Sequence, residues 1–303
     1  MMRFSVKRLF NKLGVLLLQA VSHLPFFILY FLSDIFYIFI NKVFKYRKKV
    51  IVTNLKNSFP EKSEAEIKDI TRKFYRHFCD IFVESLKGYS ISKEKLLKRF
   101  EYKSLDLFER YYNEGRSVIL VGMHFNNWEW CSVMPELVKH RIYGVYSPIR
   151  GNEAFNNYLR KSRSRFKGNL IPMDKSARLA VDFAKSEIPQ AIWLLADQSP
   201  PPNTKSWIMF LNQETGFFSG PEKIAFRSRQ PLVFEHVKKV GRGRYNVFHY
   251  PLIEDYEGIE SGDILIAFTR KMEELIREDP QYYLWSHRRW KRKRPEDIPL
   301  IET

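Results

Sequence analysis

Residues 117–130 (SVILVGMHFNNWEW) constrain the fold of this chain more than any other stretch. The apolar run 118–121 is closed by Gly122, and this pattern predicts a short buried strand. The residues that follow, up to about 139, carry apolar side chains at helical spacing, so we expect a helix directly after the strand. His124 would then lie at the carboxyl end of a strand, where open α/β sheets place their chemistry.

His124 and Glu129 could form a general base within this stretch. Two residues five apart in one continuous helix point about 140° away from each other and would not meet. If His124 lies in the turn and Glu129 in the first helical turn, the carboxylate can fold back onto the imidazole. Such a carboxylate fixes the histidine tautomer and stabilises the imidazolium. The residues alone equally allow a strand-end histidine beside an unrelated glutamate that the helix dipole favours.

A second polar pair, Asp197 and Gln198, follows the strongly apolar segment 191–196. We expect that segment to be a strand of the same sheet, so that Asp197 also lies at a carboxyl end and could come near His124. Two such pairs in one sheet favour a shared site. Asp197 could instead simply cap the turn into the SPPPN loop.

Strand and helix patterns alternate through most of the chain, which predicts an α/β fold. The expected architecture is a central, mostly parallel or mixed sheet flanked by helices. The last two strands are expected to pair antiparallel across residues 241–243. Strand patterns occur at 96–102, 118–121, 141–146, 169–172, 191–196, 232–237 and 245–250, and helix patterns at 46–59, 63–87, 105–113, 154–166, 176–185, 221–229 and 263–278.

A long apolar segment, 13–44, lies between two basic clusters at 3–12 and 42–49. Its length permits a membrane span, which needs roughly 20 apolar residues. However, Pro25 divides the segment, and the positive-inside rule would put both basic flanks in the cytoplasm. A helical pair lying in the membrane interface fits these charges better than a single tilted span, which is the alternative.

The charge balance of the chain predicts an anionic partner. Its 303 residues include 51 Lys and Arg against 34 Asp and Glu, a formal net charge of +17. Nucleic acid, a phosphorylated small molecule, an acidic protein or an anionic membrane face would all satisfy this charge. Length and apolar content predict a membrane-anchoring helical segment at 1–45 and one catalytic domain at 46–303. Cys79 and Cys131 form no motif and favour a reducing compartment.

Several motifs together resemble the late acyltransferases of lipid A biosynthesis, the lauroyl and myristoyl transferases of the lysophospholipid acyltransferase superfamily. The likeness covers nearly the whole chain: the apolar N-terminus, YRKKVIVTNLKNSFPEKSEAEI, GMHFNNWE, GVYSP, SRSRF, LLADQSP and YYLWSHRRWKRKRP. The H-x-x-x-x-E spacing is weakly specific by itself and becomes specific in this order of blocks. Many relatives have HLGNWE here, so Asn126 replaces a glycine in the turn after His124.

The resemblance implies transfer of a fatty acyl chain from an acyl carrier protein thioester to a hydroxyl of a lipid A precursor. His124 would deprotonate the hydroxyl, and Glu129 would orient and polarise His124. A backbone N–H at the helix start or an arginine would stabilise the oxyanion. By family position that arginine is Arg163, with Arg165 second, although both could belong to a solvated basic face. Asp197 matches the family's DQ acid and would support the site or bind the acceptor.

The implied partners are an acyl carrier protein, a phosphorylated glycolipid acceptor and an anionic membrane surface, at the cytoplasmic face of the bacterial inner membrane. Acyl carrier protein or coenzyme A thioesters would be the co-substrate, and the mechanism requires no metal or organic cofactor. Gln198 is a further candidate for substrate binding. Arg288 and Arg289 could clamp a phosphate, with Trp285 and Trp290 at the lipid boundary.

Two other functions stay open at this point. An acyltransferase acting on a lyso-phospholipid, an aminolipid or another glycolipid would keep the chemistry and change the acceptor. The basic, aromatic C-terminal run could instead bind RNA or a DNA backbone. Nucleic-acid binding explains neither the apolar N-terminus nor the His124 and Glu129 pair, so nucleic acid is not an expected partner.

Overall fold

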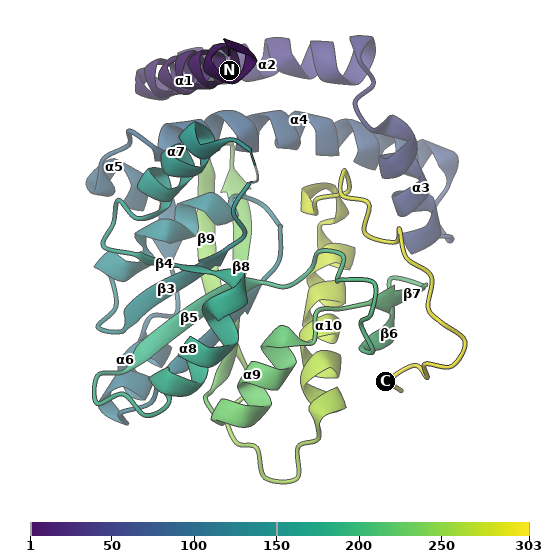
Figure 1. Ribbon diagram of the computed structural model, residues 1–303. Coiled ribbons are helices and arrows are strands. Elements are labelled where there is room, and N and C mark those ends of the chain that lie inside the picture. The colour runs from purple at the N-terminus through teal and green to yellow at the C-terminus, as the bar shows by residue number, and fades with distance from the viewer. Residues whose placement is uncertain (1, 150, 303) are drawn as a thin grey trace.

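The computed structural model describes residues 2–149 and 151–302, and its centre is a mixed sheet (Figure 1). Seven strands of the described chain form this sheet in the order β1-β9-β8-β2-β5-β3-β4. Only β8 and β9 pair antiparallel; the other neighbours are parallel, which confirms the predicted α/β fold. The bounds are β1 Phe100–Tyr102, β2 Val118–Gly122, β3 Arg141–Tyr146, β4 Asn169–Pro172, β5 Gln190–Leu195, β8 Leu232–Gly241 and β9 Arg244–Ile253.

Helices cover both faces of this sheet, and the alternation of β2 side chains shows which helices face which core. Ile119 and Val121 pack in the core shared with α8, α9 and α10, whereas Val118 and Leu120 pack toward α6. Successive strand residues point to opposite faces, so β2 is buried from both sides. The bounds are α3 Lys48–Ser58, α4 Glu64–Gly88, α5 Lys93–Leu97, α6 Asp106–Asn113, α7 Glu153–Arg163, α8 Ser176–Phe183, α9 Gly220–Ser228 and α10 Ser261–Glu278.

The long helix α4 begins where the sequence predicts. Ser63 accepts a hydrogen bond from the Glu66 backbone N–H, and the Glu66 carboxylate accepts one from the Ser63 backbone N–H. This reciprocal pair satisfies two donors that a helix start otherwise leaves open. In Figure 1, α4 runs across one end of the sheet.

Three segments differ from the prediction. The expected strand at 96–102 is divided into the short helix α5 and β1. The expected helix after His124 is instead a 3-10 helix, η2 (Trp128–Glu136), which contains Pro135. A hairpin of β6 (Trp207–Phe210) and β7 (Gln213–Gly216) was not predicted, because it follows a proline-rich loop and lacks a clear strand pattern. Two further short 3-10 helices are η3 (Met173–Lys175) and η4 (Pro280–Tyr282).

The N-terminal helices form a separate layer on the outer side of α4 (Figure 1). Helix α1 (Met2–His23) ends just before Pro25, and α2 (Phe26–Ile38) begins just after it, as the sequence predicts. A π-helical turn, η1 (Phe39–Val43), extends α2. Within the described residues, the stretch Phe26–Val43 is the one helix whose length and composition would let it cross a membrane. Only 17% of that stretch is buried.

Candidate active site

The candidate site is built where two neighbouring parallel strands end. His124 follows β2 and Asp197 follows β5, and the register of these strands places Gly122 opposite Leu195. His124 Nδ1 lies 2.7 Å from Asp197 Oδ1. The predicted proximity of these two residues is therefore confirmed, and it follows from the parallel pairing of their strands.

Asp197 is held in its ionised form. Burial alone would raise its pKa, but the imidazole of His124 and the backbone N–H groups of His124 and Asp197 together lower the pKa below the ordinary aspartate value. An ionised carboxylate accepts the hydrogen bond from Nδ1–H, so the lone pair on Nε2 is available as a base. The side-chain nitrogen of Gln198 lies 3.2 Å from His124 Nε2. The Gln198 amide can donate to the Nε2 lone pair, the same position that a substrate hydroxyl would occupy.

Glu129 lies in the same pocket but is hydrogen-bonded to a different group. The Arg163 guanidinium, from the end of α7, donates to both carboxylate oxygens, with Nε 2.8 Å from Oε2. Burial would raise the pKa of Glu129, but the charge and hydrogen bonds of Arg163, with a contribution from His124, lower it overall. His124 Nδ1–H donates to Asp197, so the expected folding of the Glu129 carboxylate onto the imidazole is wrong, and Glu129 interacts with His124 through its charge.

Trp128 is a further neighbour of His124. Its indole meets the His124 imidazole edge to face, with ring centroids 4.9 Å apart. The 3-10 helix starts at Trp128, which places this ring against the imidazole next to Glu129. The sequence reading missed this residue, although an aromatic side chain between the two motif residues was visible in HFNNWE.

The turn after His124 adopts a left-handed conformation at Asn126, with φ of 54°. Glycine is the residue that usually occupies this region, and asparagine is among the few others that tolerate it. The Asn126 side chain donates to the carbonyl of Val237 at 2.8 Å, and its backbone N–H donates to Tyr282. Asparagine therefore fits this left-handed position, and its side chain ties the turn to the strand β8.

The other predicted arginines lie in different surroundings. Arg165 donates to the carbonyl of Gly88 at 2.8 Å rather than lining the pocket. Arg288 is exposed, whereas Arg289 is 3% exposed and its guanidinium packs 4.3 Å from the Phe217 ring centroid. The two consecutive arginines therefore do not present one surface.

The expectation that Trp285 lies at the lipid boundary is wrong. Trp285 is fully buried and stacks near Trp290, whose indole N–H donates to the Thr215 hydroxyl at 2.7 Å. The segment before them is fixed against the catalytic turn: the Leu284 N–H donates to the His124 carbonyl. This pairing makes the C-terminal segment part of the site's frame.

His287 is a further residue that the sequence reading missed. Its Nε2 accepts the Ser199 backbone N–H at 3.1 Å. Burial is the largest cause that lowers the pKa of His287, to about 4, which keeps the ring neutral and able to accept. His287 thereby fixes the loop that begins with Asp197 and Gln198.

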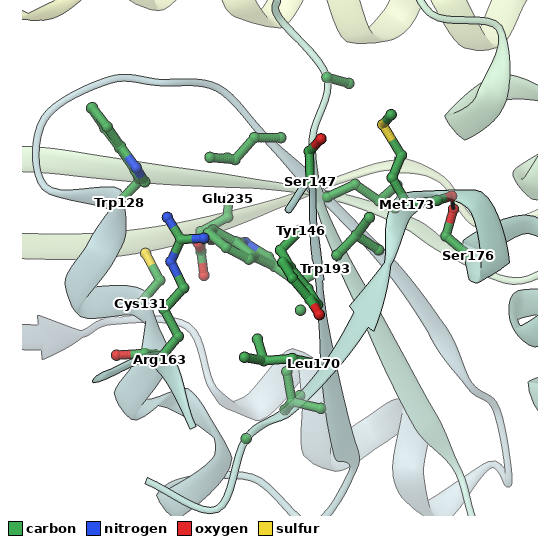
Figure 2. Close-up of a pocket in the computed structure, with 18 of the residues that line it drawn as sticks. Trp128, Cys131, Tyr146, Ser147, Arg163, Leu170, Met173, Ser176, Trp193 and Glu235 are labelled. Atoms are coloured by element: carbon green, nitrogen blue, oxygen red, sulfur yellow. Dashed lines mark hydrogen bonds between the residues drawn. The ribbon is translucent and has the colours of Figure 1, made fainter. Parts of the chain in front are cut away.

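An apolar cavity of about 460 Å³ opens beside His124. Figure 2 shows Trp128, Cys131 and Arg163 on one side of it, with Tyr146 and Trp193 between them and Met173. Further lining residues are mainly apolar or small: Met134, Pro135, Ile142, Gly144, Val145, Leu170, Ala177, Leu194, Leu195, Ala196, Phe218 and Ile224. The cavity can hold an extended apolar chain whose polar end reaches the histidine. Across residues 2–149 and 151–302, no cluster of His, Cys, Asp and Glu has metal-ligand geometry.

Comparison with known proteins identifies the family. A family model described as bacterial lipid A biosynthesis acyltransferase matches residues 2–292. The chain belongs to this family. The chain is also similar to the lipid A biosynthesis palmitoleoyltransferase of Escherichia coli K12, 25% identical over 286 residues, which cover 92% of this chain and 89% of that protein. The lipid A biosynthesis lauroyltransferase of the same strain is 24% identical over 291 residues, covering 95% and 92%.

The lipid A biosynthesis acyltransferase of Shigella flexneri matches with the same identity and coverage as the palmitoleoyltransferase. These findings confirm the resemblance drawn from the motifs. The protein is an acyltransferase of the lipid A biosynthesis family, and the acceptor class implied by this family is a lipid A precursor.

Proposed function

We propose that this acyltransferase moves a fatty acyl chain from an acyl carrier protein thioester to a hydroxyl of a lipid A precursor, with His124 as the general base. The observation that carries the proposal is the ionised Asp197 on Nδ1 of a histidine that borders an apolar cavity. The family match supports the acceptor class.

The proposed reaction begins when His124 Nε2 takes the proton of the acceptor hydroxyl. The oxygen attacks the thioester carbonyl and forms a tetrahedral intermediate with a negatively charged oxygen. As the carbon–sulfur bond breaks, the imidazolium returns its proton to the leaving thiolate. The products are an ester and a thiol. Asp197 stabilises the imidazolium through both steps.

Arg163 is the proposed donor for the oxyanion. A guanidinium carries five N–H donors, and the Nε and Nη2 groups that contact Glu129 leave others free to face the cavity. The ion pair with Glu129 fixes the guanidinium plane, which is the preorganisation that this kind of catalysis requires. In this proposal Glu129 orients Arg163 and adds negative charge near the imidazolium.

The proposed position of the donor's acyl chain is the cavity beside His124. Its lining is mainly apolar, and the thioester end would lie between His124 and Arg163. The net charge of +17 supports an acidic carrier protein and a phosphorylated acceptor as partners. Exposed Arg288 remains a candidate for a phosphate contact.

We also propose that α1 and α2 lie in the plane of the cytoplasmic leaflet of the inner membrane rather than crossing it. Tyr30, Ser33 and Asp34 form one face of α2, and all three bond to the folded body. A crossing would place Asp34 within hydrocarbon, which costs about 3 kcal/mol at a helix centre. The opposite face exposes Phe27, Phe31, Ile35, Ile38 and Phe39, as an interfacial helix does.

The surroundings of this face fit an anionic membrane. Lys42, Lys45, Lys48 and Lys49 follow it and are exposed. Each basic residue near an anionic surface contributes roughly 1 kcal/mol of attraction. Both termini of the helical pair would remain on the cytoplasmic side.

The experiment that tests the function is mass spectrometry of total lipids from cells that lack the enzyme and express either the wild type or His124→Ala. A missing acyl chain on lipid A in the His124→Ala cells supports the proposal, and His23→Ala, an exposed histidine on α1, serves as the matched control. An unchanged lipid A with an altered phospholipid or aminolipid would assign a different acceptor. Wild-type lipids in the His124→Ala cells would overturn the mechanism.

A further inference from the structure

Glu84, near the C-terminal end of α4, is a fully buried carboxylate that joins three elements. Its Oε1 accepts from the Tyr30 hydroxyl on α2 at 3.0 Å. Its Oε2 accepts from the Tyr245 hydroxyl on β9 at 2.7 Å and from the Asn127 side-chain amide at 2.8 Å. A buried carboxylate with this many donors is fixed in position, and it fixes its donors in turn.

Asn127 connects Glu84 to the catalytic residues. It is the N-cap of η2, and its Oδ1 accepts from the Trp130 backbone N–H at 3.3 Å. The main-chain oxygen of Glu84 also accepts from the Trp130 indole at 2.9 Å. Trp128 and Glu129 are the first residues of η2, so the cap that Glu84 holds sets where both enter the pocket.

Tyr30 connects Glu84 to the N-terminal layer. The Arg242 guanidinium lies 4.5 Å above the Tyr30 ring, and Arg242 also bridges Asp34 and Asp80. At Gly243, a Cβ atom would lie 1.7 Å from the Tyr30 hydroxyl, so the hairpin turn can approach this closely only as glycine. The β8–β9 turn therefore contacts Tyr30 and fixes its position when α2 packs on α4.

We propose that Glu84 is a positioning residue that couples the seating of α2 to the geometry of the catalytic turn at 124–130. The chain of contacts runs from Tyr30 through Glu84 and Asn127 to the start of η2. The outer face of α2 is the proposed membrane-docking face. Lipid bound there would hold α2 against α4, and through Glu84 it would keep residues 124–130 in the positions described above. This coupling deepens the proposed function and rests on it for its catalytic consequence.

Three single variants of the full chain test the coupling. Tyr30→Phe removes one hydrogen bond to Glu84, and Glu84→Gln keeps the shape of the side chain while weakening its acceptance of three donors. Ser33→Ala is the matched control: Ser33 also lies on α2 and also bonds to α4, at 2.8 Å, but its partner is Asp80. Thermal unfolding of each variant shows that the protein is folded before exchange is measured.

The readout is amide hydrogen exchange of peptides covering residues 124–131, with and without vesicles of phosphatidylethanolamine and phosphatidylglycerol. We expect Tyr30→Phe and Glu84→Gln to exchange about fivefold faster there, the effect of losing one net hydrogen bond. Ser33→Ala is expected to change only peptides of α2 and α4. Vesicles are expected to slow exchange at 124–131 in the wild type and not in Tyr30→Phe.

Unchanged exchange at 124–131 in both Tyr30→Phe and Glu84→Gln would overturn the coupling, as would an equal increase in Ser33→Ala. An acyl-transfer assay then separates the two proposals. A fall in kcat with little change in KM in the two coupling variants supports positioning of the catalytic turn. If exchange rises as expected but the wild type transfers no acyl chain to a lipid A precursor, the coupling stands and the proposed function fails.

Discussion

Two carboxylates lie close to His124, and their partners differ. Asp197 holds Nδ1 at 2.7 Å, whereas Glu129 is paired with Arg163. The sequence gives both residues by motif, but it cannot show which one reaches the ring. Asp197 reaches the ring because β2 and β5 pair in parallel, whereas Arg163 holds the Glu129 carboxylate. In the proposed mechanism, Asp197 therefore orients the base, and Glu129 places the oxyanion donor.

Asp197→Asn and Glu129→Gln should consequently differ in kind. An asparagine at 197 favours the wrong tautomer of His124, and in serine proteases the equivalent change lowers kcat by about 10⁴-fold. We expect a loss on the order of 10³- to 10⁴-fold for Asp197→Asn. Glu129→Gln frees the Arg163 guanidinium and should cost about 10²-fold, similar to one oxyanion donor. Steady-state kinetics with an acyl carrier protein thioester measures both, and equal losses would contradict this division.

Glu84 gives the protein a pH dependence of stability with a distinct sign. Burial raises its pKa to about 7 from 4.5, with Asp80 raising it further and Tyr245, Lys239 and Asn127 opposing. The native state then binds more protons than the unfolded state between these values. Stability is full below about pH 4.5 and falls as pH rises to about 7, by up to roughly 3 kcal/mol.

Glu84→Gln should remove this loss. Thermal unfolding between pH 5 and 8 is expected to show a smaller decline of Tm in the variant than in the wild type. The depressed pKa values of Asp197 and Glu129 act in the opposite direction and in a more acidic window, because their stabilisation is lost as pH falls. Parallel pH profiles for the wild type and Glu84→Gln would show that Glu84 does not titrate in this range.

Helices and strands with a regular spacing of apolar residues could be predicted from the sequence. Elements that depend on contacts with distant residues could not. The run 118–121 and the capped helix α4 carry their structure in their own spacing. The hairpin β6–β7 has no such pattern, and its turn places Leu211 at positive φ, where the burial of this side chain rather than local preference supports it. The basic, aromatic sequence around Trp285 suggested a lipid boundary. Its burial could not be predicted, because it comes from contacts with Phe59, Tyr283 and the segment around Trp290.

The turn between β8 and β9 offers a test of how tightly α2 packs against the folded body. Gly243→Ala adds a left-handed strain of about 1–2 kcal/mol and a clash with the Tyr30 hydroxyl. Gly115→Ala is a matched control, because Gly115 also has positive φ, 69°, and an added Cβ meets nothing within 4 Å. We expect Gly243→Ala to lower Tm by several degrees more than Gly115→Ala, at about 2 °C per kcal/mol. Equal Tm shifts in the two variants would show that α2 can move away from the turn without loss of stability.

Strand β3 offers a test of the cavity. Gly144 lines it, and an added Cβ would sit in ordinary contact with Leu170, 3.4 Å away. Gly144→Val should therefore fold and reduce the space for an acyl chain, whereas Gly144→Ala should have little effect. Lipid mass spectrometry is expected to show shorter chains transferred by Gly144→Val. Unchanged chain length with full activity would place the chain elsewhere.

For the whole molecule, the N-terminal layer is attached to the body by buried groups. Leu29 is fully buried and Ser33 is 1% exposed, and both lie on the face of α2 that meets α4. The sequence predicted a separable anchor at 1–45 and a catalytic domain at 46–303, and this division stays a prediction. The composition indicated an apolar N-terminal segment, but the polar contacts of α2 with Asp80, Glu84 and Arg242 could be seen only in the fold.

Removal of residues 1–44 should lower membrane association and retain a cooperative thermal transition. The transition is expected at a lower temperature than in the full chain, because Asp80 and Glu84 lose α2 partners and the apolar surface of α4 becomes exposed. Differential scanning calorimetry and flotation with anionic vesicles measure the two effects. Loss of the transition would show that α1 and α2 belong to the core, and retained flotation would place the membrane contact elsewhere.

The pairing of residues 124–126 with the segment near residue 284 has a consequence for synthesis. Leu284 donates to the His124 carbonyl, Phe125 bridges to Tyr283, and the Asn126 N–H donates to Tyr282. These partners are made about 160 residues after His124, so a nascent chain carries the base long before its frame exists. We therefore expect no acyl transfer until residues 282–284 have been made and packed, so a product that ends before them would carry the HFNNWE motif without activity.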